Sequence, residues 1–259
     1  MRINIRPAAA HTVMVVHNLS SFTPYGNLSQ RTLVAARILE LFAAARRIRR
    51  DLQSSANHKP LRNKNVALLL AGPVPSVPST LQRAATELGA RVSQVWCRQP
   101  DGALHVDITP MARTLGHMYD AIDCGTLPAA TVREIEKAAG VPVYEGLGLD
   151  SHPARMLADL MTLYEHPRPA SPSPNTIHFR GDPGSEHAKA FISAARNIGF
   201  EVIPEDNPPA ANDAAFVVDA CNSPRWPMHA SSHAIDEQRR DENHRSVIQA
   251  VLVDTISRA

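Results

Sequence analysis

The sequence predicts an α/β fold with two doubly wound parallel-sheet domains, of which the second is truncated. Short apolar runs of strand length alternate with segments whose apolar residues recur at helical spacing, and the connections between them are short. In the stretch 115–166 this alternation reads strand, helix, strand, helix. Such units cross over right-handedly, so their loops gather at the carboxyl edge of a parallel sheet, where these folds bind ligands.

The first half of the chain repeats strand and helix four times, as a doubly wound sheet requires. The predicted strands are Val66–Leu70, Arg91–Trp96, Tyr119–Cys124 and Val141–Tyr144. The predicted helices are Leu28–Leu52, Ser79–Gly89, one that Thr109 and Pro110 open and that runs into Leu115, and Pro128–Ala139, which Gly140 ends. The outer side of helix 28–52 carries arginines at positions 31, 37, 46, 47, 49 and 50. A basic helix suits an acidic partner or nucleic acid, but a solvated face is the interpretation that we favour.

Another helix begins after residue 150. Pro153 opens its first turn, and Asp150 or Ser151 can cap it. His152 should therefore lie at the carboxyl edge of the sheet, on a helix N-terminus. A buried stripe runs along this helix through Met156, Leu157, Leu160, Met161 and Tyr164.

The second half follows a proline-rich linker at residues 167–175. Its predicted elements are the strand Thr176–Phe179, a GDPGSE turn, the helix His187–Ile198 ended by Gly199, the strands Phe200–Ile203 and Ala215–Asp219, and the final helix Asp241–Ile256.

Composition excludes several classes of protein. The 259 residues are 44% apolar and 20% charged, with a formal net charge of +2, which argues for neither a nucleic-acid nor a membrane partner. No run of 18 apolar residues exists, so no transmembrane helix is expected. The basic start is followed by too short an apolar stretch for a secretory signal. Three widely spaced cysteines make no disulfide framework, and a reducing cytoplasm is the expected location.

Three blocks carry a resemblance to a known family. The segments LGHMYDAI, AGVPVYEGL and HPARMLADLMTLYEH resemble the LGRMYD, AGVPVWNGL and HPTQxLADLxTxxEH motifs of the aspartate/ornithine carbamoyltransferase family, the ornithine branch most closely. The resemblance implies a carbamoyl-phosphate domain, to which the final helix returns (residues 1–150 plus 241–259), and a shortened amino-acid-binding domain (151–240). It also implies a trimer formed through the first domain, or a mixed oligomer with an active relative.

Carbamoyl transfer needs several donors that converge on one anion. Aligned on the family, the STRTR motif falls on Val74–Pro78, where only Ser76 keeps a hydroxyl and the prolines remove backbone N–H donors. His117 replaces the arginine of LGR, Arg155 replaces the glutamine of HPxQ, and His152 is retained. His152 either faces a ligand or is a helix N-terminal histidine bonded to a backbone carbonyl. Together with His117 and Arg155 it could still line a basic pocket for an anion.

The amino-acid side of the implied site is also altered. Of the GDxxNN turn, Gly181 and Asp182 remain, whereas Ser185 and Glu186 replace the asparagines. Cys221 falls on the cysteine of the HCLP strand end, where we expect a buried small apolar residue more than an active group.

Other motifs are weak. His229, His233 and Glu237 have a spacing that would bind zinc on a helix, but PMHASSHAIDEQ is loop-like, so no metal is expected. There is no P-loop, GxGxxG or GxSxG, and no cofactor is expected.

No residue is assigned a catalytic role. The candidate ligand-binding residues are Ser76, His117, His152, Arg155, Asp182 and Cys221. Three hypotheses follow. The first is a pseudoenzyme that acts as a binding or assembly subunit, which we favour. The second is a repurposed transferase acting on a different amino-acid-like or anionic substrate in the same cleft. The third is a divergent working carbamoyltransferase.

Overall fold

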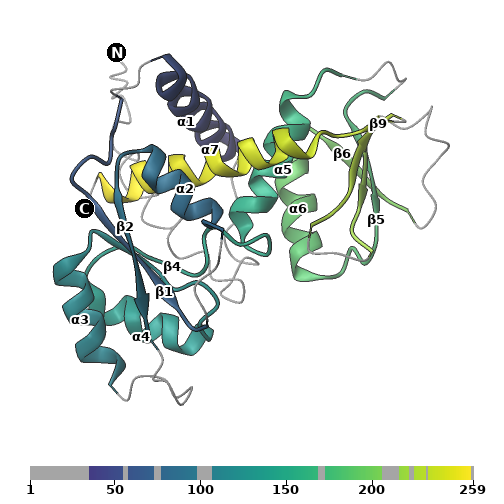
Figure 1. Ribbon diagram of the computed structural model, residues 1–259. Helices are drawn as coiled ribbons and strands as arrows, with labels where there is room; N and C mark the ends of the chain where they lie inside the picture. Colours follow the sequence, from purple (N-terminus) through teal and green to yellow (C-terminus); the bar gives the residue numbers. More distant parts are fainter. Residues whose placement is uncertain are drawn as a thin grey trace, which may run out of the picture.

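The computed structural model contains two sheets joined by long helices (Figure 1). It describes residues 35–54, 58–72, 77–97, 107–168, 173–205, 216–221, 225–231 and 233–257. The first sheet has four parallel strands in the order β2-β1-β3-β4. They are β1 (Asn65–Leu70), β2 (Arg91–Trp96), β3 (Ala121–Asp123) and β4 (Val143–Tyr144). The predicted α/β fold class is confirmed.

The central strand β1 shows why this sheet needs helices on both faces. Successive side chains of a strand point to opposite faces. Val66 and Leu68 belong to one buried cluster, and Ala67 and Leu69 to another. The second cluster is completed by α3 (Ile108–Met118) and α4 (Ala129–Ala139). The first is completed by α1 (Ala35–Ser54), α2 (Thr80–Glu87) and α7 (Glu237–Ile256).

A glycine of the LGH block lets α3 and α4 pack closely. A Cβ atom at Gly116 would lie 1.7 Å from the carbonyl oxygen of Ala139. Gly140 then ends α4 in the left-handed region at φ 70°, as the sequence predicts.

The second sheet has the order β6-β5-β7-β8-β9 and is covered by α6 (Glu186–Asn197). Its strands are β5 (Thr176–Arg180), β6 (Glu201–Pro204), β7 (Phe216–Asp219), β8 (Met228–Ala230) and β9 (His233–Ala234). The first three are parallel, but β8 is antiparallel to β7 and to β9. The prediction of a loop at residues 227–238 is therefore wrong, because β8 and β9 form a hairpin there. Strands of three and two residues are too short to show an alternating pattern.

Helix α5 (Pro153–Glu165) lies between the two sheets and is buried on nearly every side. Its N-cap is His152, whose Nδ1 accepts the N–H of Ala154 at 3.0 Å, so the prediction of Asp150 or Ser151 as the cap is wrong. The imidazole nitrogen does what a serine or aspartate oxygen does at other helix starts.

Helix α7 runs from the second sheet back across α5 to α1 and α2 (yellow in Figure 1). It starts four residues before the predicted position and is capped by Asp236. The division into two domains at residues 150 and 240 stays a prediction, as does the linker, of which residues 169–172 lie outside the described parts. None of the described helices has the length and apolarity to cross a bilayer.

Candidate functional site

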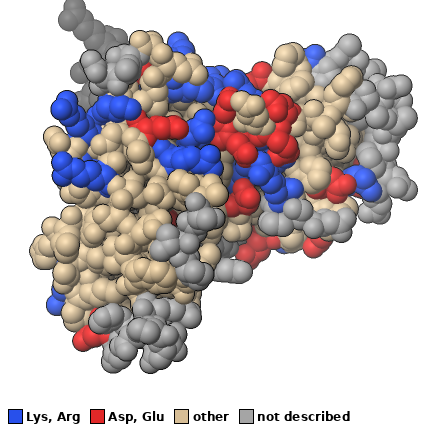
Figure 2. Space-filling view, viewed as in Figure 1, with Lys and Arg blue, Asp and Glu red and all other residues tan. Residues whose placement is uncertain are grey.

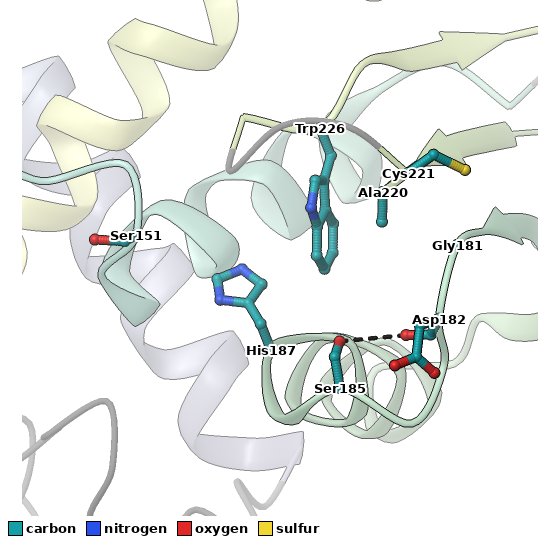
Figure 3. Close-up of a pocket in the computed structure, with 8 residues that line it drawn as sticks. All are labelled: Ser151, Gly181, Asp182, Ser185, His187, Ala220, Cys221 and Trp226. Carbon is teal, nitrogen blue, oxygen red and sulfur yellow. Dashed lines mark hydrogen bonds between the residues drawn. The ribbon is translucent and has the colours of Figure 1, made fainter.

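The carboxyl ends of β5 and β7 open into a pocket of about 550 Å³ (Figure 3). One wall is the turn between β5 and α6, and the facing wall is the segment after β7. The loop before α5 contributes Ser151 from the far side (Figure 3). The lining residues are Ser151, Gly181, Asp182, Ser185, His187, Ala220, Cys221 and Trp226.

The β5–α6 turn is held by its own hydrogen bonds. Asp182 Oδ1 accepts the N–H of Gly184 at 2.8 Å, and Ser185 Oγ donates to the Asp182 carbonyl at 3.2 Å. Ser185 is also the N-cap of α6, accepting the N–H of Ala188 at 3.3 Å. Gly181 has φ 118°, and a Cβ there would meet the Ala220 backbone at 3.0 Å. The turn therefore presents a fixed polar rim, and it places the candidate Asp182 at the pocket.

The pocket wall opposite this rim is aromatic. Trp226 is 8% exposed, and its ring lies 4.8 Å from the ring of His187 in an edge-to-face arrangement. Phe179 and Phe191 pack on the same indole at 5.4 and 5.5 Å. Burial lowers the pKa of His187, an effect that Asp159 opposes. A neutral imidazole against an indole makes this wall mainly apolar at neutral pH.

Cys221 lies at the pocket with its side chain exposed. The prediction of a buried small residue at this position is therefore wrong. Its N–H donates to Asp219 Oδ1 at 3.1 Å, and this bond, together with the nearby Arg180, lowers the pKa of Asp219.

His152 lies at the base of α5, as predicted, but it is buried. Its side chain is 5% exposed, and burial lowers its pKa to about 4. Since Nδ1 accepts the N–H of Ala154, the neutral ring carries its proton on Nε2. The bond to an N–H rather than to a carbonyl gives His152 a structural role as a cap.

Three carboxylates lie around Arg155, whose buried Nε and Nη2 donate no hydrogen bond among the described residues. Its side chain is 2% exposed, and Nη1 lies 2.8 Å from Asp241 Oδ1 and 3.6 Å from Asp150 Oδ1. Nε lies 3.4 Å from Asp159 Oδ1. Burial opposes the ionisation of Asp241, but Arg155 and Arg225 outweigh it and lower its pKa. A guanidinium surrounded in this way has little positive potential left for an external anion.

Two more buried residues complete this seam between α5 and α7, and the sequence did not single out either. Arg240, with 0% side-chain exposure, donates from Nε and Nη2 to the two oxygens of Asp159 at 3.0 Å each. His244 is 2% exposed, and burial, together with Arg155 and His152, lowers its pKa to about 3. The buried residues in the first half of α7 are polar (Arg240, Asn243, His244 and Ser246), so no apolar pattern in the sequence marks them as buried.

The expected basic pocket of His117, His152 and Arg155 does not form among the described residues. His117 is exposed in the last turn of α3, and no hydrogen bond or ion pair in the described parts joins it to the other two. The acidic residues of α5 and α7 hold Arg155 inside the protein instead. Ser76 lies outside the described residues. Beside it, Ser79 Oγ caps α2 by accepting the N–H of Gln82 at 3.1 Å.

A buried carboxylate holds the loop that leads to α5. Asp123, at the end of β3, accepts the N–H of Leu147 at 2.9 Å and that of Gly125 at 3.3 Å. Burial raises its pKa to about 6, although these N–H donors oppose the rise. Asp123 therefore positions the segment that carries His152.

The zinc geometry considered from the sequence is not present. His229 and His233 lie on the antiparallel strands β8 and β9, paired with Ala234 and Ala230, rather than on one helix. Within the described ranges, no group of three or more metal-ligating side chains comes together.

Comparison with known proteins places these features in a family. The family described as aspartate/ornithine carbamoyltransferase, carbamoyl-P binding domain, matches residues 27–165, more than half of the chain. Among solved structures, the ornithine carbamoyltransferase from Pyrococcus furiosus is 20% identical over 84% of this chain and 61% of that one, with a TM-score of 0.51. The catalytic subunit of M. jannaschii aspartate transcarbamoylase is 21% identical over 66% and 56%, also with a TM-score of 0.51.

A third solved structure covers nearly the same length. The ornithine carbamoyltransferase from Gloeobacter violaceus is 18% identical over 86% of this chain and 95% of that one, with a TM-score of 0.55. The chain spans only 61% and 56% of the length of the other two. At these identities the similarity to solved structures shows the fold.

Proposed function

Because this chain belongs to the aspartate/ornithine carbamoyltransferase family, we propose that it is a member that has lost ordinary carbamoyl transfer and acts as a pseudoenzyme. Its role is that of a binding or assembly subunit. Fold does not carry function by itself, so the proposal depends on the residues of the site.

The single observation that carries the proposal is the burial of Arg155 among carboxylates. Three carboxylates surround its guanidinium, which is 2% exposed. The neighbouring His152 is occupied as a helix cap and is neutral at physiological pH. Transition-state stabilisation in acyl or phosphoryl chemistry needs donors aimed at the charge that develops on the substrate. Here the retained His152 and the substituted Arg155 instead contact groups of the protein itself.

Direct assay tests the loss of transfer. The protein is incubated with carbamoyl phosphate and L-ornithine, and release of phosphate together with carbamoylated ornithine is followed. Isothermal titration with carbamoyl phosphate, phosphate and L-ornithine in turn runs beside it. We expect no turnover. Turnover that a His152→Ala variant abolishes, in a protein that stays folded, would instead establish a working carbamoyltransferase.

The assembly role has its own test. We propose a homotrimer through the first domain, or a mixed oligomer with an active relative. Light scattering after gel filtration should give the mass of a trimer for the purified chain, or of a mixed species when a relative is added. A monomer at micromolar concentration in both cases contradicts this part of the proposal.

The open pocket supports one alternative, a repurposed transferase. Its polar rim at Asp182 and Ser185 and its aromatic wall suit an amino-acid-like substrate with an apolar part. Transfer of a group to an amino acid other than ornithine, lost in an Asp182→Asn variant, would favour this alternative, whereas binding without turnover fits a binding subunit.

A further inference from the structure

A groove on α1 lies outside the site described above. It encloses about 430 Å³ and is lined by Ala43, Arg46, Arg49 and Arg50. The arginines are spaced i, i+3 and i+4, which places them on one face of the helix. Figure 2 shows Lys and Arg side chains over α1, beside the Asp and Glu side chains that cover the N-terminal end of α7.

One of the three arginines is fixed in place. Arg49 Nη1 donates to Asn243 Oδ1 at 2.6 Å, and Nη2 lies 3.4 Å from Glu165 Oε1. Its side chain is 17% exposed. A guanidinium held by an amide and a carboxylate has lost most of its rotamer freedom before any ligand arrives, so little further entropy is lost on binding.

The residues that line this groove carry three positive charges and no negative charge. Glu165 does not line the groove, but it pairs with two of its arginines, Arg46 at 4.0 Å and Arg49 at 3.4 Å, and also with Arg239 at 3.0 Å. In the described parts of the chain Arg50 makes no hydrogen bond or ion pair, and its side chain is exposed. Like charges at this spacing on a helix repel each other. An anion bound among the arginines would therefore reduce the electrostatic repulsion that is present in the free protein.

We propose that the α1 groove binds a phosphate-bearing anion through Arg46, Arg49 and Arg50. A guanidinium donates two parallel N–H bonds to a phosphate, and a dianion matches the excess of positive charge better than a second monovalent carboxylate. The volume of the groove admits one or two phosphate groups with a small substituent. The phosphate comes from a soluble phosphate ester or from a lipid headgroup.

Titration of the whole protein with pyrophosphate at low ionic strength tests the site. We expect one equivalent to bind, with an affinity that falls as salt is added, because the arginines are partly exposed and screened. Arg46→Gln and Arg50→Gln should each weaken binding about tenfold, the effect of one charge-assisted hydrogen bond. Both side chains are exposed enough that the variants should unfold at the temperature of the original protein.

The matched control is Arg113→Gln, an exposed arginine on α3, which should leave the affinity unchanged. A parallel arm measures co-sedimentation with phosphatidylcholine vesicles containing a phosphatidylinositol phosphate. Binding in either arm that Arg46→Gln and Arg50→Gln weaken supports the site, and the arm that responds identifies the source of the phosphate.

The proposal is overturned if neither probe binds, if the two variants bind as the original protein does, or if Arg113→Gln weakens binding equally. The same variants separate this site from the family cleft. If the binding heat of carbamoyl phosphate disappears in the Arg46→Gln variant, carbamoyl phosphate binds in the α1 groove. If the heat persists, it binds at the family site instead.

Discussion

The seam between α5 and α7 and the pocket at the second sheet differ in where their polar side chains lie. In the seam, the basic side chains are buried: Arg155 and Arg240 meet Asp159, and His152 caps its own helix. At the pocket, Asp182 and Cys221 stay at the surface around a hollow of about 550 Å³. The difference shows that carboxylates can hold buried basic residues inside the protein in one region, while the rim of the other region stays open to solvent.

Thiol reactivity should show the largest contrast between the two regions. Cys221 is exposed at the pocket, whereas Cys97 and Cys124 are buried under the first sheet. With an aromatic disulfide reagent, we expect one thiol to react at least about 10³-fold faster than the other two, since these react only after an opening that costs about 4 kcal/mol or more. A Cys221→Ser variant should lose the fast phase. Two fast phases in the native protein would contradict the burial of the other thiols.

Removing a charge from the seam should have the next largest effect. Arg240→Met leaves Asp159 buried without its bidentate partner, and we expect a loss of about 3–5 kcal/mol in the free energy of unfolding. Urea denaturation measures it. Arg239→Met, next in sequence but 44% exposed, is the control and should cost less than about 1 kcal/mol. Equal losses in the two variants would mean that the seam is not a closed network.

Acid should weaken the seam before the rest of the fold. The folded-state pKa of His152 is about 4 and that of His244 about 3, against 6.5 for the free group, so the unfolded chain takes up protons first. Stability is therefore full above pH 6.5 and falls as the pH drops toward these values. At pH 5 each histidine should cost about 2 kcal/mol.

Asp123 acts in the opposite sense. Its pKa is raised to about 6, so the folded protein takes up a proton at Asp123 as the pH falls below 6, and the buried charge is removed. The free energy of unfolding should therefore gain about 1 kcal/mol from this group between pH 7 and pH 5. Urea denaturation at pH 7 and pH 5 should show a lower free energy of unfolding at pH 5, and this difference should be smaller in a His244→Gln variant. Exposed His117→Gln is the control, and an unchanged pH slope in His244→Gln would refute the role of the seam.

The smallest expected effect lies at the pocket rim. Ser185→Ala removes the cap of α6, and we expect a loss of about 1 kcal/mol. Ser193→Ala, exposed in the same helix, should change stability by less than about 0.5 kcal/mol. If both variants behave alike in thermal unfolding, the polar rim is not held by this cap.

Local pattern was enough to predict most elements of the fold. Helix and strand positions in the first half follow from apolar spacing and from stop signals such as Gly140, and the strand Arg91–Trp96 matches β2 residue for residue. The hairpin of β8 and β9 was missed because its short strands form only against β7.

The candidate site was less predictable, because its outcome depends on residues far away in sequence. Arg155 meets Asp241 across 86 positions, and Arg240 meets Asp159 across 81. The sequence placed His152 correctly at a helix start, but nothing local to it indicated that α7 would return with the acids and His244 that enclose it. Cys221 was misjudged because its exposure at the pocket depends on which elements pack around the end of β7, which its local sequence does not show.

The path of α7 has a consequence for biosynthesis. This helix follows both sheets in chain order, yet it covers the apolar face of α1, with its buried residues Ile38, Phe42, Ala45 and Ile48. At about 5–20 residues per second, a ribosome needs roughly 10–40 s to translate from α1 to the end of α7. During that time the apolar face of α1 lacks the cover of α7, so we expect the nascent chain to be a client of ribosome-associated chaperones until α7 has been made.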